Sequence, residues 1–247
     1  MKERFKRYFA EFFGTMFLVL FGCGTAMAVG TNAKQGSGYI LTALAFGLVL
    51  MVLSYSICKK SGCHVNPAVS LAMLMLGELK IGDFFGYVVA QIGGSFGACG
   101  LLTVIFFGHT SSYGANVYYD DEPWVSLLIE VILTVLFVSA VIIASQTKEH
   151  RNISGIISGT ALILVHIMGI QLTGTSVNPA RSLAPAVFAG GRALSESWVF
   201  IVAPLVGAVI AVFLCKWLVL EKDDDIKEDE EETAEENVTE DDVDGEQ

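Results

Sequence analysis

Apolar residues gather in six long stretches that short polar segments separate. Each stretch has about 20 or more residues with few charges, which is the length that an α-helix needs to cross about 30 Å of bilayer hydrocarbon. The pattern therefore predicts six membrane-spanning helices, near residues 9–30, 39–58, 82–107, 124–146, 153–172 and 197–220.

Two further apolar segments are too short to span a membrane. Residues 67–76 (PAVSLAMLML) and 179–189 (PARSLAPAVFA) would each reach only about 15 Å as helices, half of the hydrocarbon thickness. Each follows an Asn, a favoured N-cap residue, and begins with Pro, which is favoured at the first helical position. We expect two half-helices that begin near the middle of the membrane.

The chain also repeats itself. AEFFGTMFLVLF at 10–21 aligns with IEVILTVLFVSA at 129–140, and HVNPAVSLA at 64–72 aligns with SVNPARSLA at 176–184. Each half holds three spans, an odd number, so the second half must insert with the opposite orientation. Since non-helical backbone at this depth must be buried in protein or line a water-filled cavity, a continuous pore is the simplest architecture. We therefore predict an all-α membrane protein with six transmembrane helices and two re-entrant half-helices, an inverted 3+3 repeat around a central pore.

The predicted organisation is a first repeat at 1–107, an extracellular connector at 108–123, a second repeat at 124–220 and an acidic cytoplasmic tail at 221–247. Basic residues gather on the cytoplasmic side of membrane proteins, and with the N-terminus inside only Lys34 and Arg192 lie in outer loops. Both termini are then cytoplasmic, in a multi-pass protein of the cell membrane. The basic residues placed inside are Lys2, Arg4, Lys6, Arg7, Lys59, Lys60, Lys80, Lys148, Arg151 and Lys216.

Composition supports a membrane protein and narrows its partners. Hydrophobic residues make up 53% of the chain and charged residues 17%, against about 25% charged in soluble domains. Residues 221–247 hold 16 acidic residues and 2 lysines, so the net charge of −11 comes from a tail of −14 on a body of +3. We expect this tail to be disordered. No basic, aromatic-rich surface indicates nucleic acid as a partner.

Two Asn-Pro-Ala boxes, one per half after the second and fifth predicted spans, are the most specific motif in the chain. Together with Glu11 and Glu130 in the first and fourth spans, they resemble the aquaporin (major intrinsic protein) family, in its water-selective microbial type. The resemblance covers about residues 8–220. It implies a passive water channel in the lipid bilayer, not an enzyme, assembled as a homotetramer without a cofactor or metal ion.

The boxes have a physical interpretation as the pore centre. Two helix N-termini that face one another place partial positive charge there, and Asn66 and Asn178 can offer side-chain N–H donors to the lumen. A water whose oxygen accepts from both amides cannot relay a proton along the file, and the helix dipoles repel cations. Water is expected to pass while protons and ions are excluded. Simple helix caps without a pore are the alternative interpretation.

Arg181 lies one turn beyond Asn178, where facing lipid would cost about 2.5–3.5 kcal/mol or more. It should therefore face water or a partner group, although it could also pin loops through carbonyl hydrogen bonds. By resemblance to the family, Phe46, His166, Thr175 and Arg181 form the narrow outer filter of water-selective members. Glycerol-passing members generally have a small residue in place of His166 and an aspartate where this chain has Ser182. A glycerol or small neutral solute facilitator is nevertheless the first alternative function.

Four further residues are candidates for supporting roles. We expect Glu11 and Glu130 to accept hydrogen bonds from the irregular backbone before each half-helix, with proton or ion coupling as the alternative. His64 resembles the family's pore-lining histidine on the cytoplasmic side, with simple packing as its alternative. Cys63 is the counterpart of Thr175, which suggests a pore-facing thiol, although a buried inert cysteine fits as well.

The connector leaves a different function class open. Residues 108–123 are polar and rich in Tyr and acid, and a membrane adhesion or structural protein could use them as a contact surface. Asp120, Asp121 and Glu122 indicate a solvated face more than a divalent cation site. The acidic tail could also contact Lys59 and Lys60. No nucleophile and base set, metal-ligand spacing or phosphate-binding loop indicates an enzyme.

Overall fold

The structure is a computed structural model that describes residues 2–30, 38–108 and 112–219. Within these residues it contains helices and no strand. Short 3-10 helices cover Ile57–Lys60, Tyr119–Asp121 and Lys148–Ile153. The α-helices are α1 (Lys2–Val29), α2 (Gly38–Tyr55), α3 (Pro67–Met75), α4 (Ile81–Ile105), α5 (Pro123–Gln146), α6 (Ser154–Thr173), α7 (Pro179–Ala189), α8 (Gly191–Glu196) and α9 (Val199–Leu218).

Six helical segments of the described chain are long and apolar enough to cross a membrane, which confirms the predicted number of spans. They contain α1, α2, α4, α5, α6 and α9. The predicted ends differ in places: α1 begins at Lys2 and not near residue 9, and α2 ends at Tyr55 and not at 58. Helix α8 was not predicted because six residues are too few to show a helical period. The predicted tail at 221–247 lies outside the described residues.

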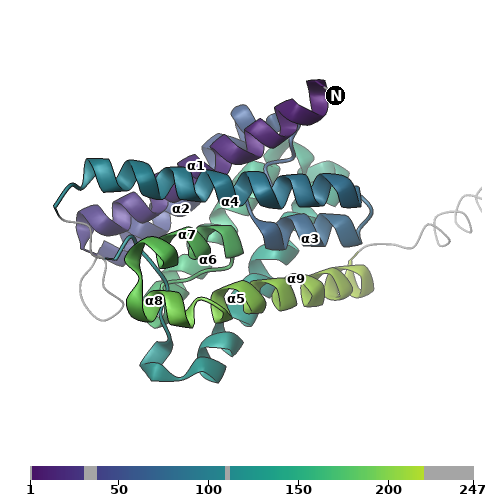
Figure 1. The fold of residues 1–247 in the computed structure, drawn as a ribbon. Coiled ribbons are helices and arrows are strands. Elements are labelled where there is room, and N and C mark those ends of the chain that lie inside the picture. The colour runs from purple at the N-terminus through teal and green to yellow at the C-terminus, as the bar shows by residue number, and fades with distance from the viewer. Residues whose placement is uncertain (1, 31–37, 109–111, 220–247) are drawn as a thin grey trace, which may run out of the picture.

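The long helices pack as a bundle in which α1 lies along α4, α2 along α6 and α5 along α9 (Figure 1). Small residues allow the backbones to approach closely. A Cβ atom at Gly47 would lie 2.4 Å from the Gly159 carbonyl oxygen, and one at Gly94 would lie 2.1 Å from the Phe12 carbonyl oxygen. Both contacts are too short for any side chain, so these glycines are required by the packing.

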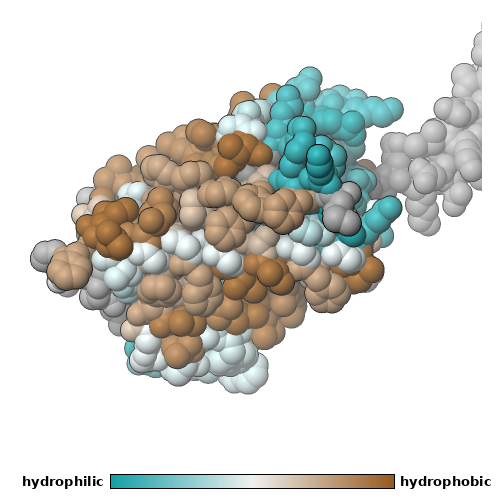
Figure 2. All heavy atoms as spheres, turned by 45° about the horizontal axis from the view of Figure 1, so that its top comes forward, coloured by the Kyte–Doolittle hydropathy of each residue, from teal (hydrophilic) through white to brown (hydrophobic). Residues whose placement is uncertain are grey.

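The outer surface fits an integral, multi-pass membrane protein. Figure 2 shows hydrophobic residues over the sides of the bundle and hydrophilic residues gathered near the start of α1. We call this the basic end, defined by the start of α1, the 3-10 helices at Ile57–Lys60 and Lys148–Ile153, the start of α4 and the end of α9. The opposite, connector end carries residues 112–122 and α8.

The start of α1 is tied to the start of α4 at the basic end. Asp83 of α4 is buried and accepts hydrogen bonds from Arg4, from Arg7 at 3.1 Å and from the Tyr8 hydroxyl at 2.7 Å. This contact between residues more than 70 positions apart extends α1 beyond its apolar stretch. It explains why hydropathy alone placed the start of α1 too late.

The two halves have the same unusual backbone before their short helices. The angle φ is 54° at Cys63 and 49° at Thr175, each three residues before the box Asn. It is 44° at Val65 and 45° at Val177, each one residue before it. Non-glycine residues rarely adopt this left-handed region, β-branched ones least of all, so surrounding contacts must hold them there. The repeat seen in the sequence is therefore also a repeat in conformation.

Candidate functional site

Helices α3 and α7 begin against one another in the interior of the bundle. The Asn66 side-chain nitrogen donates to the Val177 carbonyl at 2.7 Å, and the Asn178 side-chain nitrogen donates to the Val65 carbonyl at 2.9 Å. The oxygen of each amide caps its own helix by accepting from backbone N–H groups. Each amide nitrogen carries two hydrogens, so one N–H per asparagine remains after these bonds. Both asparagines line a common cavity.

Two buried carboxyl groups hold the strained backbone before these helices. Glu11 accepts from the N–H groups of His64 and Val65 at 3.0 and 2.6 Å. Glu130 accepts from the two equivalent N–H groups of the second half at 2.8 and 3.0 Å. Neither residue has exposed surface. A role in proton or ion coupling would need access to the lumen. The two buried carboxyl groups instead bind backbone N–H groups, which is a structural task.

Three of the four expected filter residues are in contact. The rings of Phe46 and His166 stack with their centroids 4.4 Å apart, and the Arg181 guanidinium carbon lies 5.0 Å from the centre of the Phe46 ring. These residues line the same cavity as the two box asparagines. Thr175 is fully buried and packs near Gly169, on the helix that carries His166.

The hydrogen bonds of the filter leave several polar atoms unmet. His166 Nδ1 lies 2.8 Å from the Leu162 carbonyl oxygen, which can only accept, so Nδ1 carries the proton and Nε2 of the neutral ring is an acceptor. This Nε2, Arg181 Nε and Thr175 Oγ1 are buried and have no hydrogen-bond partner within the described residues. Buried polar groups are nearly always paired. His166 and Arg181 line the constriction, so their two unmet atoms fit a small polar ligand there, whereas Thr175 does not line it.

Arg181 is held by the connector as well as by α7. Its Nη1 donates to the Gly114 carbonyl at 2.9 Å and to Asn116 Oδ1 at 3.0 Å, and its Nη2 donates to the Gly174 carbonyl at 3.3 Å. The loop pinning considered above as an alternative is thus present, and Arg181 also lines the cavity. Asn116 Oδ1 also accepts from Ser182 at 2.7 Å. Sequence reasoning missed Asn116 because it lies in a polar segment without a motif.

The chain is similar to known proteins over most of its length. A family model described as Major intrinsic protein matches residues 1–215. A protein named Aquaporin Z from Brucella melitensis is 40% identical over 218 residues, 85% of this chain and 96% of the relative. Another of that name, from Bradyrhizobium diazoefficiens, is 35% identical over 223 residues, 86% of this chain and 93% of the relative. The chain belongs to the major intrinsic protein family.

Members of this family are channels, not enzymes. A solved structure shows the same fold: the X-ray structure of the aquaglyceroporin from Plasmodium falciparum aligns with a TM-score of 0.78 over 87% of this chain and 97% of that chain. At 20% sequence identity this likeness concerns the fold alone. The family assignment rests on the family model and the two bacterial relatives.

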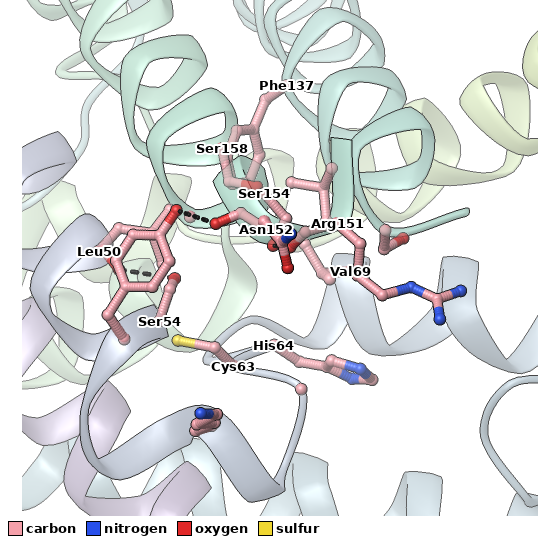
Figure 3. A pocket seen from close by; sticks show the side chains of 16 residues that line it. Leu50, Ser54, Cys63, His64, Val69, Phe137, Arg151, Asn152, Ser154 and Ser158 are labelled. Carbon is pink, nitrogen blue, oxygen red and sulfur yellow. Dashed lines mark hydrogen bonds between the residues drawn. The ribbon is translucent and has the colours of Figure 1, made fainter. Parts of the chain in front are cut away.

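A wide vestibule opens from the basic end of this major intrinsic protein. It is a cavity of about 480 Å³, and its wall includes Lys59, the half-buried Cys63, His64 and Arg151 (Figure 3). Leu50, His64 and Phe137 line both this vestibule and the narrow cavity at the box asparagines. The two cavities therefore adjoin, with His64 between them, while Cys63 lines the vestibule only.

One acidic residue of the connector, Asp121, is paired with Arg192 of α8. Arg192 forms ion pairs with Asp121 and with Glu196, the latter at 2.5 Å, and Glu196 also accepts from the Tyr118 N–H at 2.6 Å. Across the described residues, no group of three His, Cys, Asp or Glu side chains could hold a metal ion. The ion pair of Arg192 with Asp121 is solvated, since the two side chains are 50% and 80% exposed.

Proposed function

We propose that this chain is a passive water channel that excludes protons and ions. In this proposal Asn66 and Asn178 form the pore centre, and Phe46, His166, Thr175 and Arg181 form the outer filter. The observation that carries it is the narrow cavity between them, with a volume of about 10 Å³. A water needs about 10–15 Å³ by this measure, so the constriction fits one water at a time. The unmet His166 Nε2 and Arg181 Nε belong to residues that line this cavity, and a water there would satisfy them.

Selection against protons and cations follows from the charges around this cavity. The helix starts of α3 and α7 contribute partial positive charge, and the remaining N–H of each asparagine offers a donor. A water that accepts from these donors turns its own hydrogens away from the centre, which interrupts a proton relay. Arg181 adds a full positive charge at the filter. Neutral water is little affected by either feature, whereas a cation is repelled by the helix starts and again by Arg181.

Selection against glycerol follows from size and from the partners of Ser182. The stacked rings of Phe46 and His166 narrow the filter, and a linear polyol has several times the volume of a water. Ser182 donates to Asn116, so the position where glycerol-passing members have an aspartate here supports the group that holds Arg181. The relatives named Aquaporin Z support a water channel, while the exclusion of glycerol rests on the filter residues alone.

Orientation and assembly are part of the proposal. Both termini are placed in the cytoplasm of a cell-membrane protein, since the basic end carries the lysines and arginines that favour the inner face. Residues 1–107 and 124–220 are then inverted repeats, the connector at 108–123 is extracellular, and α3 and α7 are re-entrant half-helices. We also propose a homotetramer with one pore per subunit, in line with the family resemblance.

The test is light scattering from proteoliposomes under an osmotic step, run with mannitol and with glycerol. The proposal predicts rapid shrinkage in both solutes and slow glycerol re-entry for the natural chain. His166→Gly and Arg181→Val should raise glycerol entry while water flux remains. Rapid glycerol entry in the natural chain would favour the glycerol facilitator. Water flux no higher than in empty vesicles would favour an adhesion or structural role.

A further inference from the structure

A chain of buried hydrogen bonds runs from Glu11 to His64. The Gln91 side-chain nitrogen donates to Glu11 Oε2 at 2.8 Å and to Ser70 Oγ at 3.0 Å. Ser70 Oγ in turn lies 3.1 Å from His64 Nδ1. Gln91 and Ser70 are fully buried, and the ring of Tyr87 packs edge-on against the imidazole of His64 with centroids 5.1 Å apart. The chain thus connects the carboxyl group that holds the loop to the histidine at the vestibule.

The direction of each bond can be derived from its donors and acceptors. Glu11 also receives the N–H groups of His64 and Val65, so its oxygens act as acceptors and the group of Gln91 that faces them must be the NH2. That NH2 has two hydrogens, one for Glu11 and one for Ser70. Ser70 Oγ therefore accepts from Gln91, and its own hydroxyl hydrogen is left for one further partner.

That partner is His64 Nδ1. If the imidazole donated instead, the Ser70 hydroxyl hydrogen would be buried with no acceptor among its recorded contacts, which costs about 1–3 kcal/mol. A neutral imidazole that accepts at Nδ1 carries its proton on Nε2. The neighbouring backbone leaves space there, since Gly62 has no side chain and a Cβ on it would lie 3.2 Å from Nε2.

We infer that Gln91 and Ser70 are positioning residues that fix His64 as the neutral tautomer with its proton on Nε2, a hydrogen-bond donor at the junction of vestibule and constriction. Its relevance to permeation rests on the proposed function. The filter histidine has the opposite arrangement, because His166 donates from Nδ1 to a carbonyl and presents Nε2 as an acceptor. The two histidines of the path would therefore bind a passing water in opposite senses, His64 by its oxygen and His166 by a hydrogen.

The experiment is nitrogen NMR of the full chain, labelled with ¹⁵N-histidine and reconstituted in lipid vesicles at neutral pH. A protonated ring nitrogen and an unprotonated one have different chemical shifts, so each tautomer is observed directly. His64→Gln and His166→Gln assign the signals. The natural chain should show His64 protonated on Nε2 alone and His166 protonated on Nδ1 alone.

Variants separate positioning from packing. Ser70→Ala should change His64 to a mixture of tautomers and leave His166 unchanged, while Ser70→Thr, which keeps the hydroxyl, should preserve the Nε2 proton. Ser95→Ala is the matched control, since Ser95 is a fully buried serine of α4 outside this chain of bonds. A proton on Nδ1 of His64 in the natural chain would overturn the inference, and so would a Ser70→Ala protein with an unchanged His64 spectrum.

Water flux measured on the same vesicles keeps the two proposals apart. Absent flux with the expected spectrum would refute the water channel and leave the tautomer assignment intact. If Ser70→Ala does not fold, the spectra of the natural chain and of Ser70→Thr decide the matter, since both retain the hydroxyl that the inference requires.

Discussion

Gly22 of α1 sets the position of the Phe46 ring, and replacing it tests where the path is narrowest. A Cβ atom at Gly22 would lie 2.2 Å from Phe46 Cε1 and 2.4 Å from two further ring carbons. Carbon atoms prefer about 3.5–4.0 Å, so in Gly22→Ala the ring must move by about 1.3 Å or more. Its neighbours include the His166 ring, with centroids 4.4 Å apart, and the Arg181 guanidinium at 5.0 Å. The ring therefore moves at the expense of the filter.

Overpacking of this kind costs about 1–3 kcal/mol. We expect this cost to disfavour the arrangement in which the Phe46 ring leaves the filter open to water. That arrangement would then be about 5- to 150-fold less populated. We expect the osmotic water permeability of Gly22→Ala proteoliposomes, measured by stopped-flow light scattering at matched protein content, to fall at least about fivefold. Gly100→Ala in α4 is the control, because a Cβ there meets nothing within 4 Å. The double variant Gly22→Ala/Phe46→Ala should recover water flux. Wild-type permeability in Gly22→Ala would refute a filter built on Phe46.

Three further predictions follow from contacts away from the pore centre. Asn116→Ala removes an acceptor of Arg181, worth about 1.5–3 kcal/mol for a charged donor; thermal unfolding should show the lower stability, and glycerol uptake should rise. Asp83→Asn should lower stability by only about 1 kcal/mol, because its arginine partners are 53% and 37% exposed; unfolding in low and high salt should show the difference shrinking with salt. Mercurials should block water flux through the Cys63 thiol in the vestibule wall, and Cys63→Ser should remove the block.

Each of these three predictions has a result that would contradict it. Unchanged unfolding and glycerol exclusion in Asn116→Ala would mean that the backbone carbonyls hold Arg181 alone. A salt-independent loss in Asp83→Asn would mean that the pair acts through packing. Mercurial block that survives Cys63→Ser would exclude this thiol as the site. Cys63 is the expected site because the other cysteines with described side chains are buried.

The fold was readable from the sequence where local chemistry sets it. The short helices were expected at 67–76 and 179–189, and the structure has them at Pro67–Met75 and Pro179–Ala189, because an Asn cap followed by Pro defines a helix start. The start of α1 was not readable, because it depends on Asp83, far along the chain. Hydropathy indicates which residues face lipid, but it does not show that Asp83 stabilises the first turns of α1.

The site shows the same division. Phe46, His166 and Arg181 could be related through the family resemblance, and the structure brings them into contact. Gln91 and Asn116 carry equally specific hydrogen bonds, yet neither belongs to a repeated motif. Their partners lie 80 and 65 residues away in sequence, so only the folded chain reveals them.

The central claim is that water passes the paired asparagines while protons do not. The direct measurement follows both fluxes in one preparation: proteoliposomes with an internal pH indicator are given an osmotic step and, separately, a pH step with the membrane potential clamped. We expect water permeability well above that of empty vesicles and a proton leak equal to theirs. A proton leak that rises in proportion to the water permeability, or water permeability equal to that of empty vesicles, would contradict it.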